Sequence, residues 1–116
     1  MEVIASSHDS MKPIEKYQMC MDPAIVAIKT VPPDEAITVT KWFIYSEPMR
    51  DKPDEVMTVL TIMDESGQVY ATNSSTFRDD FSKICVLAGN ELPITVSVYR
   101  GTSKAGREFV GCRYIG

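Results

Sequence analysis

An amphipathic stretch from Ser75 to Gly89, set between segments that alternate polar and apolar residues, constrains the fold of this chain most strongly. Its apolar residues recur at helical spacing and would bury one face of a helix: Phe77, Phe81, Ile84, Cys85 and Ala88. Ser75 or Thr76 can cap the start, with Asp79 three residues after Thr76, and Gly89 can end the helix. The sequence therefore predicts one well-defined helix late in the chain.

Segments with the two-residue period of a β-strand lie on both sides of this helix. Five are present, three before the helix and two after it: Ile37–Tyr45, Val56–Met63, Gln68–Thr72, Ile94–Tyr99 and Arg107–Tyr114. In the first of them Lys41 interrupts the apolar alternation, which predicts a β-bulge near Lys41 and Trp42. The chain is thus expected to be built mainly from strands.

The order strand, strand, strand, helix, strand, strand is the pattern of the OB-fold, a five-stranded Greek-key barrel. The expected fold class is all-β with one helix, placed between the third and fourth strands. The alternative is an open α+β sheet with the helix packed on one face. In this interpretation residues 25–116 form the OB-fold domain, and Ala24–Val31 is a short strand or an extended segment covering the core.

Residues 1–24 are interpreted as an N-terminal extension, partly disordered or containing a short helix. The first twelve residues have few apolar anchors and are expected to be unstructured. Pro13–Met21 can form a short helix, because proline suits a first turn and Ile14, Tyr17 and Met21 fall on one side.

The composition excludes several classes of protein. A length of 116 residues is typical of one domain. No apolar run approaches the roughly 20 residues that cross a bilayer, and the polar N-terminus lacks a secretory signal. Cys20, Cys85 and Cys112 form no CxxC pair, which is typical of reduced thiols in a cytoplasmic protein. His8 is the single histidine, so we expect neither a metal site nor a cofactor.

The charge of the chain is unevenly distributed. The net charge is −4, but residues 99–116 contain four basic residues against one acidic residue, Glu108. The last 18 residues therefore carry +3 and the other 98 carry −7. A local basic stripe on an acidic body can bind a phosphate backbone, although it can also be only the solubilising charge of an edge hairpin.

Basic residues occur in the two loops that OB barrels use, with the face of strands two and three, to bind single strands. Arg50 and Lys52 lie in the loop after the first strand. Lys104 lies in the loop after the fourth strand, and Arg100 and Arg107 flank that loop. Cations in these places can follow the phosphates of an unpaired strand.

Aromatic residues can supply the flat faces on which bases stack. The candidates are Trp42, Tyr70, Tyr99 and Phe109, while Tyr45 is assigned to the core and Trp42 is as much a core candidate. Phe109 shares its parity with Arg107, Gly111 and Arg113, so we expect an aromatic ring between two arginines on an outward face. The predicted nucleic-acid-binding residues are thus Trp42, Arg50, Lys52, Tyr70, Tyr99, Arg100, Lys104, Arg107, Phe109 and Arg113.

Two segments resemble the small single-stranded DNA-binding proteins encoded by tailed bacteriophages. They are Val69–Ser74 (VYATNS), followed by Phe77, and Gly101–Val110 (GTSKAGREFV), and the resemblance extends over residues 25–114. It implies an OB-fold protein that coats phage single-stranded DNA during replication or recombination in the bacterial cytoplasm. Self-association and contacts with replication or recombination proteins are the partners it suggests. Bacterial housekeeping single-strand binders end in an acidic, disordered tail that recruits partners, whereas this sequence ends at Tyr114-Ile115-Gly116, so tail-mediated recruitment is not expected.

Other functions are weighed against this one. An enzyme is not expected, because there is no Ser/His/Asp set and no phosphate-binding GxxxxGK[ST] loop. RNA is an alternative ligand, since nothing in the sequence identifies a contact to a 2′-hydroxyl. The main alternative is a small phage-encoded interaction module or inhibitor whose acidic surface engages a host protein: Asp51, Asp54, Glu55, Asp64 and Glu65.

Overall fold

The longest strand, β3 (Ala36–Pro48), organises the sheet because it changes partners along its length. Its first residues, Ala36–Val39, pair with β6 (Ile94–Thr102), and the rest pairs with β4 (Val56–Asp64). The register against β4 shifts between Val39 and Lys41. The predicted bulge is confirmed, one residue earlier than expected, at the point where the strand leaves one partner for the other.

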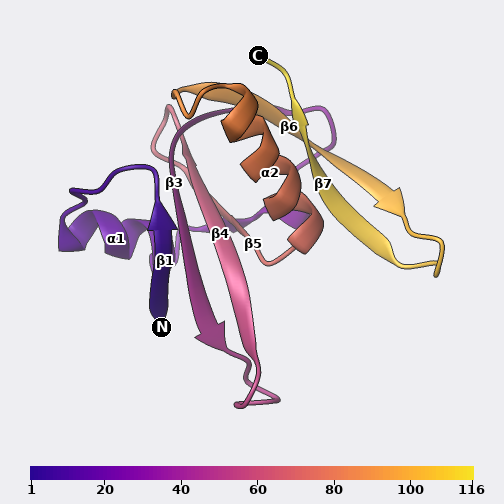
Figure 1. Cartoon of the computed structure of the whole chain (residues 1–116), viewed down its shortest axis with the longest axis horizontal. Coiled ribbons are helices and arrows are strands. Elements are labelled where there is room, and N and C mark those ends of the chain that lie inside the picture. The colour runs from indigo at the N-terminus through magenta and orange to yellow at the C-terminus, as the bar shows by residue number, and fades with distance from the viewer.

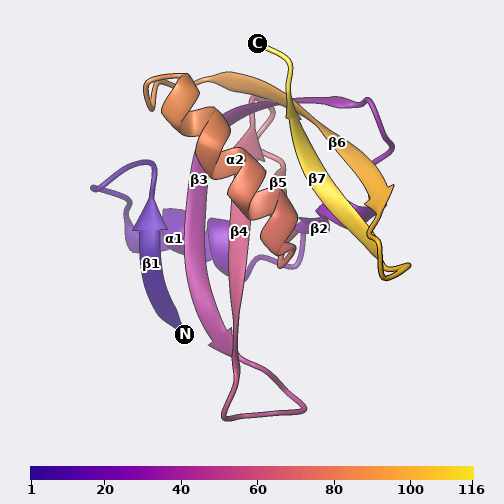
Figure 2. The same cartoon turned by 45° about the vertical axis from the view of Figure 1, so that its right-hand side comes forward.

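The computed structural model describes all residues, 1–116, as a single curled mixed sheet with two α-helices (Figure 1). The strand order is β2–β5–β4–β3–β6–β7, with β1 paired to β3. The remaining strands are β1 (Glu2–Ser6), β2 (Val26–Ala27), β5 (Val69–Thr72) and β7 (Glu108–Tyr114). The sheet thus has two more strands than the five that the sequence predicted, and it curls into a half-barrel (Figure 2).

The predicted helix is present as α2 (Ser75–Leu87), but its cap differs from the prediction. The N-cap is Ser74, whose Oγ accepts a hydrogen bond from the Phe77 amide at 3.1 Å, and Ser75 is already helical. The Ser74 hydroxyl also donates to the carbonyl oxygen of Val110 at 2.8 Å. This tertiary bond to β7 favours Ser74 over its neighbours. Gly89 follows the helix with φ of +70°, as expected for a C-terminal glycine.

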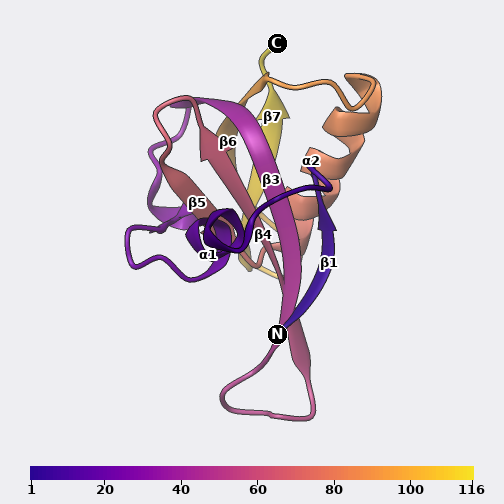
Figure 3. The same ribbon diagram turned by 90° about the vertical axis from the view of Figure 1, so that its left-hand side faces the viewer.

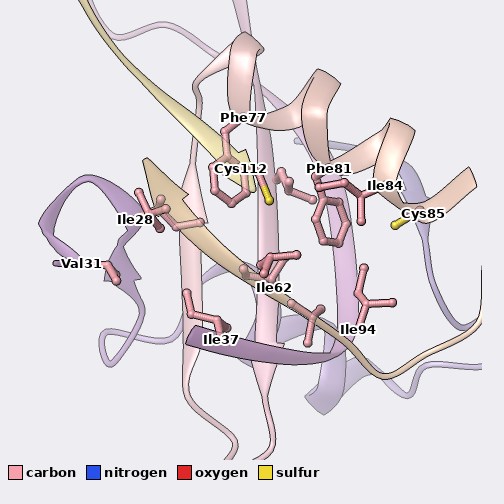
Figure 4. Close-up of a cluster of buried hydrophobic side chains, with 14 residues drawn as sticks. Ile28, Val31, Ile37, Ile62, Phe77, Phe81, Ile84, Cys85, Ile94 and Cys112 are labelled. Carbon is pink, nitrogen blue, oxygen red and sulfur yellow. The ribbon is translucent and has the colours of Figure 1, made fainter. Parts of the chain in front are cut away.

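The main core lies between α2 and the concave face of the sheet (Figure 4). Helix α2 contributes Phe77, Phe81, Ile84 and Cys85, and the helical face predicted from spacing is buried. The strands contribute Ile37, Val39, Leu60, Ile62, Ile94, Val96, Val98 and Cys112, and Ile28 and Val31 complete the cluster.

Between β5 and β7 the sheet is not closed by strand pairing. The segment that contains β2 and the 3-10 turn η1 (Ile28–Thr30) lies beside this opening. Strand β2 pairs in parallel with β5. Arg100 of β6 holds the turn by donating hydrogen bonds to the carbonyl oxygens of Lys29 and Val31, the latter at 2.8 Å. The predicted short strand is confirmed for Val26–Ala27, but Ile28–Thr30 is a 3-10 turn and not extended, and Ile28 and Val31 cover the core.

The N-terminal segment is more ordered than the sequence predicted. Residues 2–6 form β1 on the outside of β3, so the expectation of an unstructured start was wrong. The reason is tertiary, since the short strand is completed by hydrogen bonds to β3 and not by apolar anchors of its own. The predicted short helix is present as α1 (Pro13–Cys20). Figure 3 shows α1 and α2 on opposite sides of β3 and β4.

Helix α1 lies over the convex face of the sheet, opposite the main core. Because successive strand residues point to opposite faces, Val59 lies there while Leu60 faces the main core. A second apolar cluster forms on the convex face: Met11, Met19, Phe43, Tyr45, Val59 and Val69. Neither helix is long and apolar enough to pass through a bilayer.

Candidate nucleic-acid interface

A groove of about 600 Å³ lies at the opening between β5 and β7. Its floor is the convex face of the sheet, formed by Tyr45, Met57, Val59 and Ala71. One wall is the start of β7, and the other is the turn from β5 into α2, at residues 72–76. The groove therefore exists because β5 and β7 diverge there, and its lining comes from segments far apart in the sequence.

The groove combines an apolar floor with a polar rim. Met57 and Val59 line the floor, and Tyr45 is only 8% exposed, so the earlier assignment of Tyr45 to the core is confirmed. The rim carries the hydroxyl and amide groups of Thr72, Asn73, Ser75 and Thr76. An apolar surface beside scattered hydrogen-bonding groups suits a planar, partly polar ligand.

Phe109 is the aromatic residue at the β7 wall of the groove. It is half-buried and packs edge-on against Tyr99, with ring centroids 6.2 Å apart and an interplanar angle of 88°. One side of the ring is thus fixed by the hairpin while the residue still lines the groove. Such a ring can offer its free area to a base without losing its place.

Tyr99 lies beside Phe109 but is itself held by other groups. Its Oη donates a hydrogen bond to Asp80 Oδ2 at 3.1 Å, and the Arg113 guanidinium stands 5.6 Å from the ring centroid. Burial, followed by the hydrogen bond to Asp80, raises the pKa of Tyr99. Arg113 also approaches Asp34 at 3.9 Å. The structure therefore places Tyr99 and Arg113 behind Phe109, as its support.

Four of the predicted cations remain free of acidic partners. Arg50, Lys52, Lys104 and Arg107 are exposed, and the two ion pairs of the protein, Lys41–Glu15 and Arg113–Asp34, include none of them. The loops that carry these cations, β3–β4 and β6–β7, both project from the lower half of the molecule in Figure 2. Phosphates could approach these charges without displacing an existing partner.

Phe109 is the one predicted residue that lines the groove, and Arg100, Trp42 and Tyr70 are held elsewhere. Arg100 is occupied by the two carbonyl groups of the η1 segment. Trp42 faces the main core and lines a separate hollow of about 180 Å³ beside α2. Tyr70 packs against the main core and donates a hydrogen bond to Asp64 Oδ2 at 3.2 Å.

Sequence reasoning missed several residues of the groove, among them Lys29, Met57, Asn73 and Thr76. Met57 could have been found, because the second strand is apolar on both faces and only one face can meet the main core. Lys29 carried no such signal, since its position depends on how residues 26–31 fold across the opening.

No cluster of three or more His, Cys, Asp or Glu side chains has the spacing of a metal site. No protein-family model matches the sequence, and neither a curated protein nor a solved structure matches the chain. The function must therefore be argued from the groove and from the exposed cations of the two loops.

Proposed function

We propose that this protein is an OB-fold single-stranded DNA-binding protein that holds the strand in the groove between β5 and β7. It would coat DNA without strong sequence preference during phage replication or recombination in the bacterial cytoplasm. The OB-fold assignment is supported by the pairing of β3 with both β4 and β6, and by the position of α2 between β5 and β6 in the sequence. OB barrels bind with their second and third strands, which correspond to β4 and β5, and with the loops after the first and fourth strands, which correspond to the β3–β4 and β6–β7 loops.

The observation that carries the proposal is the position of Phe109. Phe109 lines a groove with an apolar floor, and the cations of the β3–β4 and β6–β7 loops are exposed and take part in no ion pair. Stacking on aromatic rings combined with cations along the backbone is the general mode of single-strand binding. Stacking tolerates any base, because every base has a π-face, which accounts for weak sequence preference.

The acidic body of the protein is compatible with this role. The net charge of −4 opposes non-specific attraction to nucleic acid, so binding depends on the local cations of the two loops. Four such cations predict that the logarithm of the affinity falls with the logarithm of salt concentration with a slope of about −3, at ~0.7 per phosphate. The rest of the exposed surface would then add little to the affinity for DNA.

The test is a titration of fluorescent oligo-dT at several salt concentrations, beside oligo-rU and duplex DNA. The proposal predicts tight binding of oligo-dT at low salt, the slope given above and weaker binding of duplex. Equal affinity for oligo-rU would extend the ligand class to RNA. Absence of oligo-dT binding at low salt would refute the proposal.

The second candidate is an interaction module that engages a host protein. It is favoured by one observation: Asp51, Asp54, Glu55 and Glu65 are exposed and form no ion pair. Three of them share the β3–β4 loop with Arg50 and Lys52, so that loop carries both signs of charge. Failure to bind oligo-dT at low salt, together with capture of a host protein that D51N/D54N/E55Q abolishes, would support this function.

A further inference from the structure

One carboxylate oxygen of α2 holds both strands of the β6–β7 hairpin. Asp80 Oδ2 accepts a hydrogen bond from the hydroxyl of Tyr99 on β6 at 3.1 Å. The same oxygen accepts a second from the backbone amide of Cys112 on β7, also at 3.1 Å. Charged acceptors make stronger hydrogen bonds than neutral ones, so this pair of contacts is a firm attachment of the hairpin to α2.

The attachment extends from Asp80 to the groove through aromatic packing. The Tyr99 ring crosses the hairpin and lies against Gly111, where no side chain could be accommodated without moving it. Its neighbour on the same face is Phe109, in the edge-on contact described above. The path therefore runs from the Asp80 carboxylate through the hydroxyl and ring of Tyr99 to the wall of the groove.

Ser74 provides a second connection between α2 and β7, nearer the groove. Its hydroxyl donates a hydrogen bond to the carbonyl oxygen of Val110. Ser74 and Asp80 therefore hold β7 at two points, Val110 and Cys112, on the side facing α2. Only Asp80, however, contacts the side chain that packs on Phe109. The two residues thus hold the same strand, but they differ in what they do to the aromatic ring.

We propose that Asp80 is a positioning residue of the nucleic-acid groove, fixing Phe109 through Tyr99 while touching no DNA itself. This inference rests on the proposed function, and it assigns a role to a residue that lies outside the groove lining. Without the carboxylate, Tyr99 loses its anchor, and Phe109 is free to leave the orientation that a base would meet. A side chain that only capped the edge of β7 would stabilise the fold without affecting how Phe109 acts.

The experiment is a double-mutant cycle between Asp80→Ala and Phe109→Ala, read as affinity for oligo-dT at fixed salt. We expect a loss of about fivefold for D80A and about tenfold for F109A, and for the double variant no more than about twofold beyond F109A alone. Multiplication of the two losses, to about fiftyfold, would overturn the positioning role. An affinity of D80A within twofold of the wild type would overturn it as well.

Two further variants keep the test decisive if D80A fails to fold. Asp80→Asn retains a carbonyl oxygen that can accept both hydrogen bonds, so its affinity should stay within about twofold of the wild type. Tyr99→Phe keeps the ring and the Cys112 contact but removes the hydroxyl, and should lose about two- to threefold. Unchanged affinity in Y99F would contradict the path through Tyr99.

Amide hydrogen exchange at Cys112 separates failure of this inference from failure of the proposed function. D80A should speed that exchange at least tenfold while D80N should not, and this readout needs no DNA. If the wild type does not bind oligo-dT, the proposed function and the positioning role both fall, even where the exchange shows that the attachment exists. If the wild type binds and the cycle is multiplicative, only the positioning role falls.

Discussion

The ring of Phe109 lies over the α-carbon of Gly101, its cross-strand neighbour in the β6–β7 hairpin. A Cβ added at Gly101 would stand 2.5 Å from the Cζ atom of Phe109, far inside van der Waals contact. Glycine at this position therefore lets the aromatic ring lie across the hairpin, over β6. The relationship is a backbone requirement of the proposed site, independent of any charge.

Gly101→Ala should displace the Phe109 ring and weaken oligo-dT binding about fivefold, because the stacking face is turned away. The fold should persist, since the backbone at Gly101 does not lie in the left-handed region. The measurement is affinity together with a thermal melt, with the exposed neighbour Thr102→Ala as the matched control. Full affinity in G101A would show that the orientation of the ring is irrelevant to binding.

Lys104→Glu/Arg107→Glu should weaken binding to every sequence alike and make the salt slope shallower by about 1.4, the loss of two phosphate contacts. The control is Lys12→Glu/Lys16→Glu, which changes the net charge equally with exposed lysines of the α1 region. Affinity and slope are read from the same titration at several salt concentrations. If both double variants lose affinity equally, the effect belongs to net charge and the hairpin tip is not part of the site.

Phe109→Ala should cost about tenfold in oligo-dT affinity, within the ~1–3 kcal/mol expected for one stacked base. The ring is half-buried against Tyr99, so a stability loss of about 1 kcal/mol should accompany it. Tyr114→Ala is the matched control, because Tyr114 is an exposed aromatic residue at the far end of the same strand. A large drop in melting temperature for F109A with unchanged affinity would show that Phe109 only packs in the fold and does not bind DNA.

The protein should lose stability as the pH rises above 9. Burial, followed by the charge of Asp80, raises the pKa of Cys112 to about 12 from an ordinary value of 9.0, and burial raises the pKa of Cys20 to about 11. A raised pKa in the folded state means that the unfolded chain releases its proton first, so folding is penalised from pH 9 up to the folded pKa. The Cys112 contribution is about 1.4 kcal/mol per pH unit in that window.

Urea unfolding at pH 8 and pH 10.5 in reducing buffer measures this loss. Cys112→Ala is the comparison, because it removes one titrating thiol while keeping a small apolar side chain. Its stability should fall less steeply with pH than that of the wild type, and identical pH dependence would refute the assignment to Cys112.

Met19→Ala should destabilise the protein by about 2–4 kcal/mol, because Met19 is fully buried between α1 and the convex face of the sheet. Met21→Ala, at an exposed position just after the same helix, should change stability by less than about 0.5 kcal/mol. Chemical denaturation measures both. A negligible effect of M19A would mean that the N-terminal segment is a detachable appendage.

Much of the secondary structure could be predicted because it depends on the spacing of apolar and polar residues that are near one another in the sequence. The burial of Phe77, Phe81 and Ile84 follows from their helical spacing, and the bulge in β3 follows from a single lysine that interrupts an apolar alternation. The first strand could not be predicted, since Glu2–Ser6 is ordered only by hydrogen bonds to β3. The N-cap of α2 was predicted at Ser75 or Thr76 but is Ser74. A tertiary contact is again the cause, because the Ser74 hydroxyl also donates a hydrogen bond to Val110 of β7.

The residues of the candidate site likewise divide into those that local patterns predicted and those that only the tertiary structure places. Strand parity predicted Phe109, which lines the groove. Lys104 and Arg107 are exposed and form no ion pair, but they do not line it, and their part in binding stays a prediction. Arg100, Trp42 and Tyr70 have the right chemistry, but the curl of the sheet turns them toward the η1 segment and the main core. Whether a side chain meets ligand or core depends on which strands pair and how the sheet bends, and those are long-range contacts that no local pattern encodes.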